Sequence, residues 1–191
     1  MEALLVSTLV VALGEIGDKT QLLALLLAAR FRRPVPIILG IFVATIANHA
    51  LAGLVGAWVR MTLSPEWLRW ILGLSFIAVA LWALKPDKLE EDEAGIKGRW
   101  GVFAVTTIAF FLAEMGDKTQ VATVMLAAKY ESLVQVVIGT TLGMLAANVP
   151  VVFLGSAAAL KLPVALIRKI AAAIFAVLGI ATLLMGTHPF S

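Results

Sequence analysis

The residues best suited to chemistry in this sequence form a short acidic motif that occurs twice. The first copy is Glu15–Gln21 (EIGDKTQ) and the second is Glu114–Gln120 (EMGDKTQ). Each copy lies inside a long apolar stretch, where one ionised side chain at mid-membrane costs about 2.5–3.5 kcal/mol. Charge that is kept in such a place usually serves a function. We therefore expect the two copies to build one site together.

The motif offers hard oxygen donors in a regular spacing. On a continuous helix, residues three or four apart share a face, so Glu15 would lie beside Asp18 and Lys19 could pair with Glu15. Four carboxylates against two lysines leave two negative charges, which matches one divalent cation or two protons. Carboxylate, amide and hydroxyl oxygens suit Mn²⁺, Ca²⁺ or Mg²⁺. The candidate donors are Glu15, Asp18, Thr20, Gln21, Asn48, Glu114, Asp117, Thr119, Gln120 and Asn148.

The composition indicates an integral membrane protein. Of 191 residues, 61% are hydrophobic and 14% are charged, whereas soluble domains have about 45–50% and about 25%. Apolar runs long enough to cross a bilayer recur along the chain. The basic residues lie at the ends of these runs, so we expect a lipid bilayer and no nucleic acid as partner. There is no cysteine for a thiolate metal site, and no nucleophile–base pair or cofactor motif, so we expect neither an enzyme nor a bound cofactor.

We predict an all-α fold with six transmembrane helices. The only long polar stretch, residues 85–100, reads as an exposed acidic linker between a first three-helix repeat (1–84) and a second one (101–191). Glu2 stands where a secretory leader would carry basic residues, so the first helix should stay in the membrane. The expected spans are approximately 3–30, 35–60, 65–84, 101–129, 133–161 and 163–186.

The two halves match beyond the motif. Gly40 aligns with Gly139, and Asn48 aligns with Asn148 after a slip of one residue. Such self-similarity indicates an internal duplication. Because each repeat would have an odd number of spans, the second must enter the membrane from the opposite side, which predicts an inverted repeat as in many secondary transporters.

Lysine and arginine gather at one set of span ends, and that side is expected to be cytoplasmic. Both termini would then lie outside and the acidic linker inside. The residues of the basic side are Arg30, Arg32, Arg33, Lys85, Lys88, Lys97, Arg99, Lys161, Arg168 and Lys169, against Arg60, Arg69 and Lys129 on the other.

Three residues in the middle of spans two and five are harder to interpret. Asn48 and Asn148 could reach the site or simply bond neighbouring helices. His49 could ligate a metal or carry a proton, but Val149 stands at its place in the second half. For His49 a packing role is therefore the plainer interpretation.

Two copies of Glu-hydrophobic-Gly-Asp-Lys-Thr in a six-span chain with an acidic linker resemble the family of small cation/proton exchangers. That family includes bacterial manganese exporters and Golgi manganese/calcium transporters. The resemblance implies proton-driven Mn²⁺ export, and the lack of an organellar targeting segment favours a bacterial plasma membrane. By the same match Glu15, Asp18, Glu114 and Asp117 would bind the cation, and Lys19 and Lys118 would balance charge. The supporting residues would be Thr20, Gln21, Thr119 and Gln120.

Other functions stay open at this point. The same site could exchange Ca²⁺ for protons, since selectivity depends on cavity size and ligand number. The acids could instead bind the ammonium group of an exported organic cation. A membrane subunit with purely structural salt bridges is a further alternative.

Overall fold

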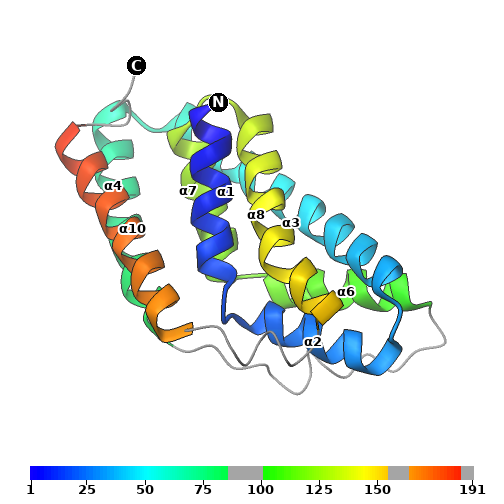
Figure 1. The fold of residues 1–191 in the computed structure, drawn as a ribbon. Helices are drawn as coiled ribbons and strands as arrows, with labels where there is room; N and C mark the ends of the chain where they lie inside the picture. The colour runs from blue at the N-terminus through cyan, green and yellow to red at the C-terminus, as the bar shows by residue number, and fades with distance from the viewer. Residues whose placement is uncertain (86–100, 155–163, 186–191) are drawn as a thin grey trace.

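The computed structural model describes residues 1–85, 101–154 and 164–185, and all regular secondary structure within these ranges is helical (Figure 1). The predicted acidic linker and the end of the predicted fifth span lie outside the described residues. The helices are α1 (Glu2–Glu15), α2 (Lys19–Phe31), α3 (Pro34–Thr62), α4 (Pro65–Ala83), α6 (Val102–Glu114), α7 (Lys118–Lys129), α8 (Leu133–Leu154) and α10 (Val164–Met185).

Four helices, α3, α4, α8 and α10, are long and apolar enough to cross a membrane. They contain 29, 19, 22 and 22 residues, and about 20 residues span the hydrocarbon core. Proline opens α3 at Pro34 and α4 at Pro65, where its missing N–H is not needed. The prediction of an all-helical membrane protein is confirmed.

The first and fourth predicted spans differ from the expectation, because each is broken at the motif into two shorter helices. The first span becomes α1 and α2, and the fourth span becomes α6 and α7. At the breaks Gly17 has φ 81° and Gly116 has φ 74°, a backbone conformation that cannot continue an α-helix and that favours glycine. The prediction that Glu15 and Asp18 share one face of a continuous helix is therefore wrong.

The two halves pack into each other in a matching way. Helix α1 lies along α8, and its counterpart α6 lies along α3. A Cβ atom on Gly139 of α8 would lie 2.5 Å from the carbonyl oxygen of Leu4, and one on Gly40 of α3 would lie 3.0 Å from that of Phe103. These glycines stand at equivalent places in the halves, and each lets a helix of the other half approach closely.

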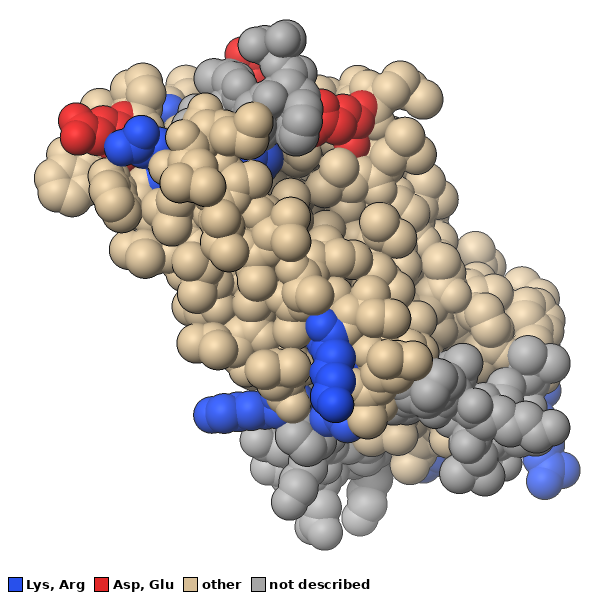
Figure 2. Space-filling view, turned by 60° about the vertical axis from the view of Figure 1, so that its left-hand side comes forward, with Lys and Arg blue, Asp and Glu red and all other residues tan. Residues whose placement is uncertain are grey.

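The surface of the molecule is suited to contact with lipid. Large apolar side chains such as Leu54, Leu74 and Val177 are more than half exposed. On the face shown in Figure 2, the described charged side chains lie toward the two ends of the molecule, and the belt between them is almost free of charge. The start of α1 and the end of α10 lie at the same end of the molecule (Figure 1).

Candidate cation site

Each motif folds into the same tight break between two helices. Helix α1 ends at Glu15, Ile16 is extended, Gly17 turns the chain, and Asp18 caps the N-terminus of α2. The Asp18 carboxylate accepts a hydrogen bond from the backbone N–H of Lys19, which satisfies one of the free donors at a helix start. Gln21 braces the turn, because its Oε1 accepts from the N–H of Gly17 at 2.9 Å.

The second copy repeats the turn, although the Asp117 side chain makes no capping hydrogen bond. Met115 is extended, Asp117 is the N-cap residue of α7, and the N–H of Gly116 donates to Gln120 Oε1 at 2.7 Å. The two copies of the motif thus adopt the same turn. The turn accounts for the glycine and the glutamine of the motif, because the glycine takes the positive φ and the glutamine accepts from its N–H.

The motif threonines orient the glutamates. Thr20 Oγ1 donates to Glu15 Oε2, and Thr119 Oγ1 donates to Glu114 Oε2 at 3.0 Å. In each copy the threonine follows the break and the glutamate precedes it. The bond therefore ties the two halves of the broken helix together and holds the carboxylate toward the interior.

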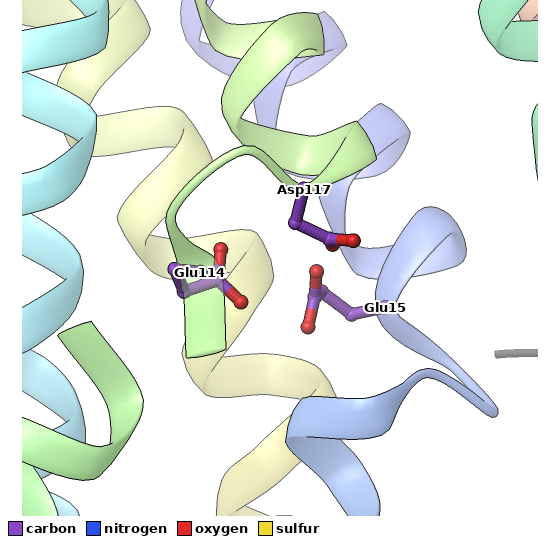
Figure 3. Close-up of side chains that lie close together, drawn as sticks. All are labelled: Glu15, Glu114 and Asp117. Carbon is purple, nitrogen blue, oxygen red and sulfur yellow. The ribbon is translucent and has the colours of Figure 1, made fainter. Parts of the chain in front are cut away.

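Three of the four predicted ligand carboxylates meet in the interior. One oxygen each of Glu15, Glu114 and Asp117 lies within 4.8 Å of the others, and Figure 3 shows the three carboxylates gathered between the two helix breaks. All three residues are buried. Like charges held this close repel, so the arrangement favours a cation or protons between them.

Asp18 takes a different position. Its Oδ1 lies 3.1 Å from Nζ of Lys118, and both side chains are buried. This ion pair joins the first motif to the second, whereas the sequence suggested pairing within one motif. Lys118 thus lies against a motif carboxylate, and Asp18 is not one of the three carboxylates that lie within 4.8 Å of one another.

The two predicted asparagines behave differently. Asn48 bridges helices, because its side-chain oxygen accepts from Gln120 Nε2 and its nitrogen donates to the Phe111 carbonyl at 3.3 Å. Asn148 Nδ2 instead donates within its own helix, to the Met144 carbonyl at 3.1 Å. In the first motif, Gln21 Nε2 reaches the backbone of α8 at Ala147.

His49 lies at the site, although its sequence context favours a packing role. His49 is fully buried, and its Nε2 lies 3.8 Å from Glu114 Oε2. The signal in the sequence was its place beside Asn48 in the middle of an apolar helix. Its missing counterpart in the second half argued against a functional role.

The fold and this site together define a class. A helical membrane protein with broken helices and buried carboxylates at the breaks is typical of ion transporters. A family model described as "Divalent cation/proton antiporter GDT1" matches residues 3–91 and again residues 102–189, and the chain belongs to this family. The predicted family is thereby confirmed, and the two matches agree with the duplication read from the sequence.

Two curated relatives are similar to this chain. A Vibrio cholerae protein named "Putative manganese exporter" is 55% identical over 183 residues, which cover 95% of this chain and 90% of the relative. The "GDT1-like protein sll0615" of Synechocystis is 26% identical over 152 residues, or 63% of this chain and 67% of the relative. No solved structure matches.

Proposed function

We propose that this protein exports Mn²⁺ from the cytoplasm in exchange for protons. The observation that carries the proposal is the buried group of Glu15, Glu114 and Asp117, in which oxygens from both halves lie within 4.8 Å of one another. The family is one of divalent cation/proton antiporters, and the relative that is 55% identical is named for manganese export.

Competition between the metal and protons for the same oxygens supplies the coupling. A cation is bound by deprotonated carboxylates, and the buried carboxylates take up protons when the cation leaves. Binding from one side and proton loading from the other then drive exchange. Lys118 holds Asp18 in an ion pair, and Asp18 becomes a fourth ligand when that pair opens.

The six-span inverted repeat fits this mechanism. Each broken helix pair counts as one span, so residues 1–84 and 101–191 each contribute three, joined by the linker at 85–100. The equivalent close contacts at Gly40 and Gly139 support a two-fold relation between the halves. Rocking of one half against the other would expose the site alternately to the two sides.

We place the protein in a bacterial inner membrane. The basic span ends, among them Arg32 and Arg33, face the cytoplasm by the positive-inside rule. Both termini then lie outside, in agreement with the common end that α1 and α10 share (Figure 1).

Proteoliposomes with an internal pH dye test the proposal. Addition of Mn²⁺ should move protons, and Asp117→Asn should abolish the signal, because it removes a carboxylate from the group of three. The exposed acid Glu131 provides the matched control, since Glu131→Gln makes the same chemical change away from the site and should leave transport unchanged.

The other outcomes identify the alternatives. Proton flux with Ca²⁺ and none with Mn²⁺ would mean a calcium exchanger. Flux with lysine and with no metal would mean that the acids bind an organic ammonium group. Full Mn²⁺ transport by Asp117→Asn would show that the group of three carboxylates does not bind the transported ion.

A further inference from the structure

His49 presents an unused nitrogen donor to the carboxylates. It lies in the middle of α3, its side chain is fully buried, and Nε2 is 3.8 Å from Glu114 Oε2. Neither ring nitrogen has a hydrogen-bond partner, and Glu114 Oε1 and Glu15 Oε1 also lack one. A buried polar atom without a partner is destabilising, so packing alone gives no reason for an imidazole here.

The register of α3 against the second motif is held by the neighbouring residue. Asn48 bonds both Gln120 and the backbone of Phe111, on either side of the break that carries Glu114. These bonds fix the part of α3 that presents His49. The imidazole therefore has a defined position beside the carboxylates.

The second half has no such donor. Val149 occupies the equivalent place in α8, and the adjacent Asn148 bonds to Met144 in its own helix. The three carboxylates come from both motifs, but the nitrogen comes from one side alone. The group within 4.8 Å consists of the three carboxylates, and the His49 nitrogen lies at its edge, against Glu114.

This donor set separates two classes of divalent cation. Carboxylates alone suit Mn²⁺, Mg²⁺ and Ca²⁺, whereas imidazole suits first-row transition metals and is a poor ligand for the hard alkaline-earth ions. Donors about 2.1 Å from one ion lie roughly 3–4 Å apart, and the distance of 3.8 Å between Nε2 and Glu114 Oε2 falls in that range. We propose that His49 is a nitrogen ligand of the transported ion and makes the site prefer manganese over calcium and magnesium. This inference rests on the proposed function and adds the basis of its selectivity.

Two measurements on the purified full-length protein test the inference. In the first, Mn²⁺ is bound to the wild type in detergent and its electron spin echo is recorded, because a coordinated imidazole nitrogen modulates the echo. We expect nitrogen modulation in the wild type and its loss in His49→Gln. This measurement on the wild type does not depend on how any variant folds.

The second measurement compares the affinities for Mn²⁺ and Ca²⁺ by titration calorimetry. His49→Gln should weaken Mn²⁺ binding about tenfold and leave Ca²⁺ binding nearly unchanged, so the preference for Mn²⁺ falls by the same factor. Retained Ca²⁺ binding also shows that the variant is folded. Val149→Ala, at the equivalent place in α8, is the control and should leave the preference unchanged.

The outcomes distinguish this inference from the proposed function. If Mn²⁺ binds to the wild type and is lost in Asp117→Asn, but shows no nitrogen modulation and the same preference in His49→Gln, the ligand role of His49 is wrong and the carboxylate site stands. If the wild type does not bind Mn²⁺ at all, both are wrong.

Discussion

At the scale of single residues, carboxylates at equivalent positions of the two motifs have different contacts. Glu15, Glu114 and Asp117 face one another, while Asp18 pairs with Lys118 of the other half. Aspartate is also the N-cap residue of the second helix in each broken pair, and Asp18 accepts a hydrogen bond there from the N–H of Lys19. The same residue type thus belongs to the group of three carboxylates in one copy and to an ion pair in the other.

The threonine that orients Glu114 allows a first prediction. Thr119→Val keeps the shape of the side chain and removes the donor to Glu114 Oε2. A hydrogen bond to a charged group contributes about 1.5–3 kcal/mol, so we expect roughly a tenfold or larger loss of Mn²⁺ affinity, measured by calorimetry. Thr119→Ser keeps the hydroxyl and should restore most of the affinity.

A matched control lies on the neighbouring helix. Thr107 donates to the Phe103 carbonyl within α6, so Thr107→Val makes the same change without touching a motif carboxylate. Equal losses in both variants would show that Thr119 has no special role in placing Glu114.

At the scale of elements, the broken helices bring carboxylates into the interior without a long polar face. In each break, the last residue of one helix and the N-cap residue of the next are three positions apart in the sequence. Free N–H groups and the positive end of the helix dipole at the N-termini of α2 and α7 stabilise the negative charge there. A continuous helix would offer no such groups.

The break itself can be tested at Gly116. A Cβ there would meet nothing within 4 Å, but φ is +74°, and a residue other than glycine in this region costs about 1–3 kcal/mol. Gly116→Ala should therefore lower the thermal stability of the protein in detergent and reduce Mn²⁺ transport, although no side chain clashes.

Gly101 separates backbone strain from the general effect of an added methyl group. A Cβ there would also meet nothing within 4 Å, and its φ is −62°. Gly101 is the N-cap residue of α6 and alanine is a poorer cap than glycine, so Gly101→Ala should cost only about 0.5–1 kcal/mol, without the strain of a positive φ. Similar melting temperatures for the two variants would mean that the turn adapts to alanine.

At the scale of the whole molecule, the site exists only where the halves interlock. Helix α8 of the second half covers α1 and α2, and α3 of the first half covers α6 and α7. Each motif is thus held by the other half. A movement of one half against the other would change the distances from Glu15 to Glu114 and Asp117, as the proposed alternating-access exchange requires.

The topology predicts opposite accessibility for the two ends of the molecule. The chain has no cysteine, so single cysteines can be labelled without background. Glu131→Cys, in the connection near the N-terminus of α1, should react with a membrane-impermeant thiol reagent added to intact cells. Arg33→Cys, between α2 and α3, should react only after permeabilisation, because basic connections stay cytoplasmic. If Arg33→Cys reacts in intact cells and Glu131→Cys does not, the orientation is opposite to the proposed one. The protein would then take up Mn²⁺ and not export it.

Much of this protein follows from the sequence alone. The apolar runs define the membrane-spanning helices, because a bilayer core requires about 20 apolar residues per crossing. The repeated motif and the aligned Gly40 and Gly139 reveal the duplication, and both motif copies could be named as the candidate site because buried carboxylates are costly without a role. None of these inferences needs a distance between residues that are far apart in the chain.

Tertiary structure decided the rest. Glycine permits a positive φ but does not require it, so spacing could not reveal that Gly17 and Gly116 break their helices. The packing of one half against the other decides which three acids meet. It also brings Asp18 to Lys118 and His49 to Glu114. Sequence spacing orders residues along one helix, whereas distances across the two halves are set by packing contacts such as those at Gly40 and Gly139.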